Sequence, residues 1–189
     1  MKFLPRNTAL LVLDMQQGFD DPVWGPRNNL DAEAKVAAMI AAWRAANAPI
    51  IHVHHDSPDP SGRLRPGTPG NGVKPEAHPQ ANELVFRKTV NSAFIGTRLE
   101  AALDAIDTRT LVVVGLTTNH CVSTTVRMAS NLGFVTFVAA DATAAFDRVG
   151  LKGEIRRAED VHNAALSDLQ DEFAEILNSE RLIDALADA

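Results

Sequence analysis

Short apolar runs alternate along this chain with longer segments that are rich in helix-forming residues. A continuous apolar run of about four to eight residues is typical of a strand buried on both faces of a parallel sheet. A longer run of strong helix formers that ends near Gly or Pro is typical of a helix. The pattern predicts strands over 8–14, 49–55, 83–88, 110–114, 134–141 and 173–177, and helices over 31–46, 97–106, 121–132 and about 157–170, with a closing helix from 179.

The helix boundaries carry their own signals. Asp31 and Ser179 stand where an N-terminal cap is expected, and Gly133 stands just past a predicted helix end. Strands that alternate with helices predict a mainly parallel six-stranded sheet with helices on both faces, which is a three-layer αβα sandwich. Right-handed crossovers place the carboxyl ends of all parallel strands on one edge, and ligands bind along that edge.

The segment 56–82 contains six prolines and four glycines and has no helical or strand period. An irregular connection of this length inside a domain is usually functional. We expect the loops 15–29, 56–82 and 143–156 to determine substrate specificity.

Composition narrows the class of protein. The chain has 189 residues, a net charge of −6, no block of Lys and Arg, and one cysteine. A single domain over 1–189 is expected, with no nucleic-acid partner, no intramolecular disulfide and no membrane partner. Met1–Arg6 leads directly into a strand-like run rather than a signal peptide, so a cytoplasmic location is expected.

Three chemically useful residues are predicted to meet at the ligand-binding edge. Asp14 ends the first strand, Lys88 ends the third, and Cys121 follows the polar turn after the fourth. Each has a plain structural alternative: an ion pair or helix cap for Asp14, a solvated charge for Lys88, and a small buried hydrophobe for Cys121. Together they supply a base, a cation and a nucleophile. A helix N-terminus after the turn favours the thiolate of Cys121 and offers N–H groups to an oxyanion.

Three blocks now carry a family resemblance. LLVLDMQQGF around Asp14, FRKTVNSAFIGT around Lys88 and VVVGLTTNHCVSTT around Cys121 resemble the isochorismatase-like cysteine hydrolase superfamily. That superfamily includes nicotinamidase, N-carbamoylsarcosine amidase and ureidoacrylate amidohydrolase, and the resemblance spans roughly 8–178. It implies a Rossmann-like topology and a catalytic triad of Asp14, Lys88 and Cys121. It also implies a cis peptide between Leu116 and Thr117, with the N–H groups of Thr117 and Cys121 forming an oxyanion hole.

The function implied by the resemblance is hydrolysis of a C–N bond in a small, non-peptide amide, ureido or carbamoyl substrate through a Cys121 thioester. An isochorismatase-type hydrolase of vinyl ethers is the alternative enzyme, although that branch does not use a cysteine nucleophile. A catalytically silent binding or scaffold protein that keeps the fold is the alternative of another class. The intact Asp, Lys and Cys set argues against it.

The histidines of the second strand raise the question of a metal. The nicotinamidase branch binds a metal through an Asp-x-His pair and a further His, and this chain does not have that motif in register. His52 and His54 share one face of a strand, and His78 could add a third ligand to a zinc site. No cofactor is expected, and a divalent metal such as zinc is the minor alternative.

Several further residues are candidates to contact the substrate, with core packing as the alternative for the aromatic ones. They are Phe19, Trp24, His55, Phe94, Asn119 and His120. Asp141 is expected to have a structural role. By the resemblance, a homodimer or homotetramer is expected.

Overall fold

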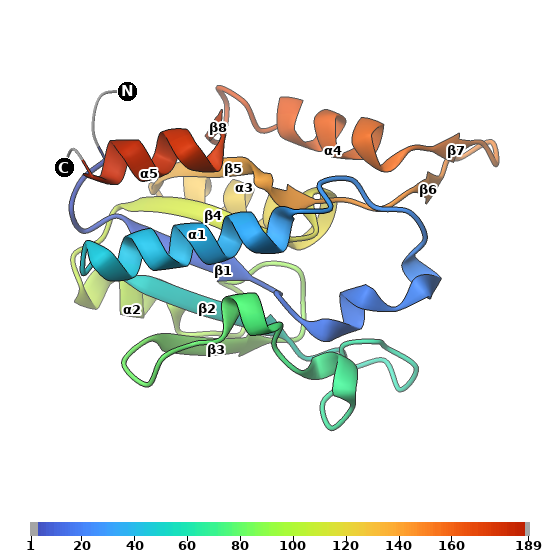
Figure 1. Ribbon diagram of the computed structural model, residues 1–189, viewed down its shortest axis with the longest axis horizontal. Coiled ribbons are helices and arrows are strands. Elements are labelled where there is room, and N and C mark those ends of the chain that lie inside the picture. The colour runs from blue at the N-terminus through green and yellow to red at the C-terminus, as the bar shows by residue number, and fades with distance from the viewer. Residues whose placement is uncertain (1–3, 188–189) are drawn as a thin grey trace.

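The computed structural model describes residues 4–187 and places a six-stranded sheet at the centre of the molecule (Figure 1). All neighbouring strands are parallel, in the order β3-β2-β1-β4-β5-β8. The strands are β1 (Ala9–Leu13), β2 (Ile50–His55), β3 (Leu84–Lys88), β4 (Thr110–Leu116), β5 (Val135–Ala144) and β8 (Glu175–Leu177). A separate two-stranded hairpin of β6 (Arg148–Val149) and β7 (Ile155–Arg156) projects from one end of the molecule.

Helices cover both faces of this sheet, as the alternating pattern predicts. The core of one face contains the buried sides of α1 (Ala32–Ala45) and α5 (Ser179–Ala187). The core of the other face contains those of α2 (Leu99–Ala105), α3 (Ser123–Asn131) and α4 (Ala158–Ser167). In Figure 1 α1 lies in front of the sheet, whereas α2 and α3 lie behind it. The three-layer α/β architecture is therefore confirmed.

The strand order contains a switch point beside β1. From β1 the chain builds outward through β2 and β3, then returns to the other side of β1 and builds outward through β4, β5 and β8. The segments that follow β1 and β4 therefore leave toward opposite faces of the sheet. Such a point opens a crevice at the carboxyl ends of the two strands, which is where α/β sheets bind ligands.

Two predicted helix caps are wrong. The Asp31 side chain makes no capping hydrogen bond at the start of α1. At α5 the Asn178 side chain accepts from the Arg181 N–H at 2.9 Å, so Asn178 is the residue that caps. Ser179 instead donates its hydroxyl to Asp141, which also accepts the Ser179 N–H at 2.7 Å. Asp141 thus has the structural role expected of it. Gly133 follows α3 with a φ of 85°, as predicted for a residue just past a helix end.

Several predicted bounds also differ by one to three residues, and the largest differences are at the ends of β5 and α4. β5 continues to Ala144 rather than ending near residue 141, and a register shift between Val113 and Gly115 accompanies this extension. α4 ends at Ser167, and the expected last turn to residue 170 is a tight turn instead. The hydrophobic pattern of the sequence does not indicate these differences, because they depend on strand pairing and packing.

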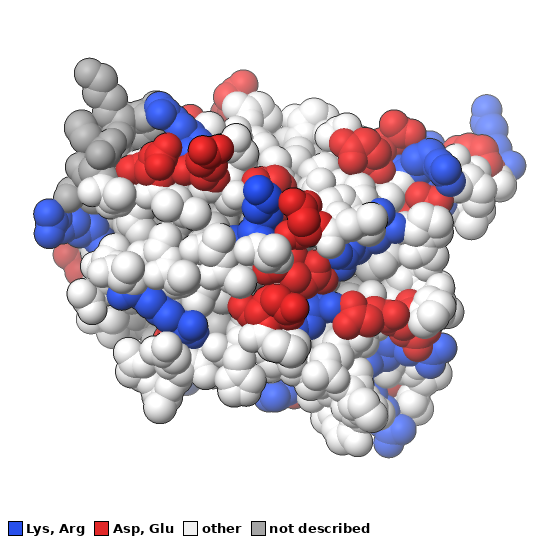
Figure 2. Space-filling view, viewed as in Figure 1, with Lys and Arg blue, Asp and Glu red and all other residues white. Residues whose placement is uncertain are grey.

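The surface mixes charges of both signs. On the face shown in Figure 2, acidic and basic side chains are interspersed across the middle of the molecule. Several charged side chains of the described residues form ion pairs, for example Arg27 with Glu33 at 2.7 Å and Arg44 with Glu83 at 2.7 Å. Within residues 4–187, no helix has the length and the hydropathy that crossing a bilayer requires.

Candidate active site

Three side chains from separate strands meet at the switch point. The Lys88 ammonium donates to Asp14 Oδ2 at 2.7 Å and to Cys121 Sγ at 3.3 Å. Asp14 follows β1, Lys88 ends β3, and Cys121 lies in the turn after β4. The side chains of Lys88 and Asp14 are fully buried, and Cys121 is 8% exposed. The side chains that the sequence predicts to converge do so, and their catalytic roles remain a proposal.

Close backbone packing brings the ends of β1 and β4 together. Gly115 pairs with Leu13, and a Cβ on Gly115 would stand 1.9 Å from the Leu13 carbonyl oxygen. Only a glycine allows β1 and β4 to approach this closely here. The next residue after β1, Asp14, adopts a positive φ of 50°, and its N–H donates to the Val53 carbonyl at 2.8 Å. That conformation ends the strand with the carboxylate at the carboxyl edge of the sheet.

The cysteine sits in an unusual helical turn. Residues Thr118–Val122 form one π-helical turn, and α3 continues directly from it. The peptide bond between Leu116 and Thr117 is cis. The Thr118 hydroxyl contacts His162 Nδ1 at 2.8 Å, which joins this turn to α4. A π-turn at a helix start is often found at functional sites.

Burial opposes ionisation of both the cysteine and the aspartate. Burial and the neighbouring Asp14 carboxylate raise the pKa of Cys121 to about 12, although Lys88 acts against this. The favourable field expected at the helix N-terminus stays a prediction, and desolvation opposes it. Burial also raises the pKa of Asp14, against the opposing effect of Lys88. A carboxylate with a raised pKa is a better proton acceptor from the thiol.

The site contains ligand types suitable for a metal, but an ammonium lies among them. Asp14, His55 and Cys121 each offer a ligand atom within 4.8 Å of the others. Lys88 Nζ lies within 3.3 Å of one such atom from each residue. A metal ion here would have to displace a buried lysine from its carboxylate. We therefore assign these atoms to the lysine.

His52 and His54, whose spacing would allow a metal pair, lie away from the candidate site. They alternate with Ile51 and Val53, whose side chains pack on the α2–α3 face, so both histidines lie on the opposite face from the site. His52 Nε2 is hydrogen bonded to Glu83 at 2.8 Å. Among residues 4–187, no group of potential metal ligands includes them or His78.

The aromatic candidates pack against one another and against the core. Phe19 and Trp24 lie 5.3 Å apart between ring centroids, and both contact Phe146. The Trp24 indole N–H donates to the Gly18 carbonyl at 2.8 Å. Phe94 lies 5.8 Å from Phe134 and packs against the core of the α2–α3 face. These contacts favour the packing role, and a substrate role stays a prediction.

The polar candidates make hydrogen bonds within or next to the candidate site. His120 Nδ1 is 3.2 Å from the Thr117 hydroxyl, and its Nε2 is 3.2 Å from the Asn119 amide. His55 Nδ1 is 3.2 Å from Lys88 Nζ. Asn119 and His120 are partly exposed beside the buried sulfur. His55, by contrast, contacts the lysine directly.

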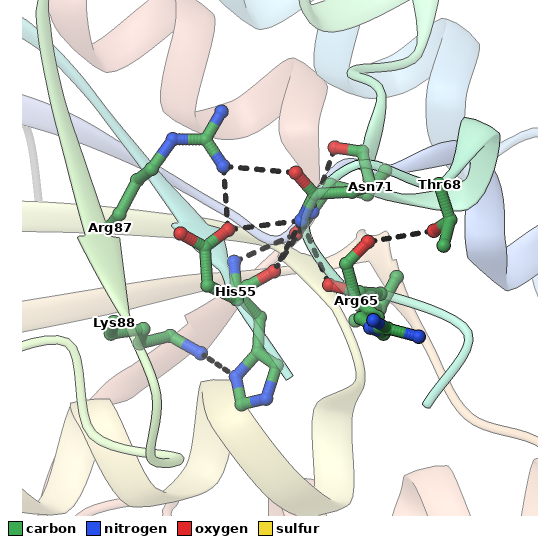
Figure 3. Close-up of polar contacts among 9 residues, drawn as sticks. His55, Arg65, Thr68, Asn71, Arg87 and Lys88 are labelled. Carbon is green, nitrogen blue, oxygen red and sulfur yellow. Dashed lines mark hydrogen bonds and ion pairs between the residues drawn. The ribbon is translucent and has the colours of Figure 1, made fainter. Parts of the chain in front are cut away.

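Two amide side chains at this edge were missed from the sequence. Gln16 is fully buried, and it both accepts from the His55 N–H and donates to the His55 carbonyl. Asn71, in the proline-rich loop, donates to the carbonyls of His55 and Leu64 and accepts from Arg87 (Figure 3). The only sequence signal was the position of Gln16 two residues after Asp14. Nothing in the sequence marked Asn71.

Comparison with known proteins finds relatives that match nearly the whole chain. The family model for the isochorismatase domain matches residues 8–181. The uncharacterized isochorismatase family protein YrdC of Bacillus subtilis is 43% identical over 180 residues, covering 95% of this chain and 96% of that protein. Nicotinamidase 3 of Arabidopsis thaliana is 30% identical over 188 residues, covering 92% and 86%. A crystal structure of an isochorismatase-family protein from Chromobacterium violaceum is 44% identical with a TM-score of 0.96, covering 100% and 98%.

Proposed function

This chain belongs to the isochorismatase family of proteins, and from that premise we propose that it is a cysteine hydrolase of C–N bonds. Its substrate is a small, non-peptide amide, ureido or carbamoyl compound. The observation that carries the proposal is the buried ammonium of Lys88, which contacts both the Asp14 carboxylate and the Cys121 sulfur. A scaffold protein has no use for a buried cation between an acid and a thiol, because burying these groups costs stability.

The first half of the reaction forms a thioester. Asp14 takes the proton of the Cys121 thiol as the sulfur attacks the substrate carbonyl carbon, forming the S–C bond. The N–H groups of Thr117 and Cys121 stabilise the oxyanion. The C–N bond then breaks, and Asp14 returns its proton to the leaving nitrogen, which departs as ammonia or an amine.

The second half releases the acid. Asp14 removes a proton from a water molecule, whose oxygen attacks the thioester carbonyl. The C–S bond breaks, the sulfur recovers the proton from Asp14, and the carboxylic or carbamic acid leaves. Throughout both halves, Lys88 keeps its charge and stabilises whichever of the two neighbours is anionic.

One oxygen of the Asp14 carboxylate is available for these proton transfers. Asp14 Oδ2 is bonded to Lys88, whereas Oδ1 is buried without a hydrogen-bond partner among the described residues. A buried carboxylate oxygen left unpaired is costly, so such atoms are rare outside functional sites. Asp14 Oδ1 supports the role of Asp14 as the group that receives and returns the proton.

The test is a substrate panel. Purified protein is incubated with nicotinamide, aliphatic primary amides, ureides and N-carbamoyl compounds, and ammonia release is measured. We expect at least one class to turn over, and Cys121→Ala to abolish that turnover without lowering the unfolding temperature by more than a few degrees. The native protein is also quenched in acid during turnover. A covalent adduct on Cys121, measured by mass spectrometry, would identify the acyl group.

Two results would overturn this proposal. One is undiminished turnover of an amide by Cys121→Ala. The other is hydrolysis of a vinyl ether such as isochorismate by the Cys121→Ala protein together with inactivity of the native protein toward every C–N substrate. A cytoplasmic location, a homodimer or homotetramer, and function without a metal stay predictions.

A further inference from the structure

The register of the sheet places a histidine beside the catalytic lysine. In the parallel pair of β2 and β3, His55 is the partner of Lys88. Paired residues of adjacent strands project to the same side of the sheet, so the imidazole and the ammonium emerge together at the carboxyl edge. His55 Nδ1 lies 3.2 Å from Lys88 Nζ, and Figure 3 shows the ring turned toward the ammonium.

The contacts of the ammonium match its donors in number. A lysine ammonium has three N–H groups, and Lys88 directs them to Asp14 Oδ2, Cys121 Sγ and His55 Nδ1 at 2.7, 3.3 and 3.2 Å. The lysine side chain is fully buried, so no solvent can replace a missing acceptor. From this we infer that His55 is a positioning residue whose neutral imidazole accepts the third N–H of Lys88 and holds the ammonium between the acid and the nucleophile.

The backbone of His55 is held from both sides, which fixes the position of its ring. Gln16 accepts from the His55 N–H at 2.8 Å and donates to the His55 carbonyl at 3.0 Å. Asn71 donates to the same carbonyl at 3.1 Å. The proline-rich loop and the segment after β1 are thereby joined at the residue that contacts the catalytic lysine.

The charges around His55 favour the neutral ring that this role needs. Lys88 of β3 and Asp14 after β1 lie beside the His55 ring, and Asp56 is the next residue in the sequence. Cys121, in the turn after β4, completes the site. Burial first and Lys88 second lower the pKa of His55, and the two carboxylates oppose this only in part. With Nδ1 as acceptor, the ring proton resides on Nε2.

This inference rests on the proposed function, but its test does not need the substrate. The rate of Cys121 alkylation by iodoacetamide, followed by mass spectrometry from pH 5 to 10, reports how readily the thiolate forms beside Lys88. His55→Asn keeps an acceptor close to the position of Nδ1. His55→Phe keeps the ring without an acceptor, and His55→Gln carries its amide beyond that position.

We expect His55→Phe and His55→Gln to slow alkylation at neutral pH by about tenfold or more and to move its pH profile upward, because Lys88 no longer faces the sulfur. His55→Asn should stay within about threefold of the native rate. Circular dichroism first establishes that each variant is folded, and His55→Gln serves if His55→Phe is not.

Two outcomes would overturn the inference. A native alkylation profile in both His55→Phe and His55→Gln means that the ammonium does not need this acceptor. An equal loss in His55→Asn and His55→Gln means that His55 acts through packing alone. Failure of the proposed hydrolysis looks different: the alkylation pattern would hold while no amide, ureide or carbamoyl compound is turned over.

Discussion

Lys88 and Asp14, 74 positions apart in the chain, form an ion pair at 2.7 Å in which neither side chain has any exposed surface. A dry ion pair is expensive to form, since both charges lose their hydration. Burying the Lys88–Asp14 pair therefore lowers the stability of the fold. Cys121 and His55 accept the two remaining N–H groups of the Lys88 ammonium.

Removing one member of the buried pair should destabilise the protein strongly. Lys88→Met leaves Asp14 without its cation in a dry site, and we expect unfolding free energy to fall by about 3–5 kcal/mol. Lys88→Met combined with Asp14→Asn removes the unpaired charge, so the double variant should recover part of that loss. Urea unfolding of the single and double variants measures the coupling, and simple addition of the two single costs would contradict it.

Glu83 should make the protein sensitive to acid. Burial opposes its ionisation, but hydrogen bonds from Arg44, the Gln80 N–H and His52 prevail and hold the pKa of Glu83 at about 2, below the ordinary 4.5. A carboxyl with a lowered pKa in the folded state contributes stability above pH 4.5, and this contribution is lost as the pH falls toward 2. Glu83→Gln should therefore cost roughly 1–3 kcal/mol at pH 7 and much less near pH 2. Urea unfolding across this range measures it, and a cost independent of pH would contradict the ionic account.

Gly115 should tolerate no side chain. A Cβ there would stand 1.9 Å from the Leu13 carbonyl oxygen at a φ of 113°, so Gly115→Ala should cost at least about 3 kcal/mol. Gly133→Ala is the matched control, because its φ is 85° but no atom lies within 4 Å of the added Cβ. That variant should lose only about 1–2 kcal/mol from backbone strain. Equal losses in thermal unfolding would show that the strand contact is not the cause.

Asn71 should hold the proline-rich loop closed. Asn71→Ala removes the amide that bonds the carbonyls of His55 and Leu64, so the loop should open more often and expose the Arg63–Leu64 bond to trypsin. We expect cleavage there to accelerate by about tenfold. Asn82→Ala alters an exposed residue in the same segment and should cleave at the native rate. Equal rates in the two variants would argue that the loop is held elsewhere.

Much of the site could be predicted because strand position alone decides it. Asp14 and Lys88 close apolar runs and Cys121 follows a third, and parallel strands bring such ends to one edge. His55 also closes a predicted strand, so its meeting with Lys88 was within reach, but only the register of β2 against β3 shows that the two are partners. The pairing register is a property of two strands, and neither strand carries it alone.

By itself the sequence determined the layers of this protein, its six parallel strands and the edge at which an acid, a cation and a thiol gather, since apolar period and strand ends are local properties of the chain. The tertiary structure decided how strongly those groups are desolvated and which residues contact them. Burial raises the pKa of the Cys121 thiol against the opposing effect of Lys88, and the local sequence does not show this desolvation. Asn178 rather than Ser179 caps the last helix, since the Ser179 N–H and hydroxyl are taken by Asp141 from β5. Desolvation and hydrogen-bond partners depend on what packs alongside a residue, and distant segments supply that only after the chain has folded.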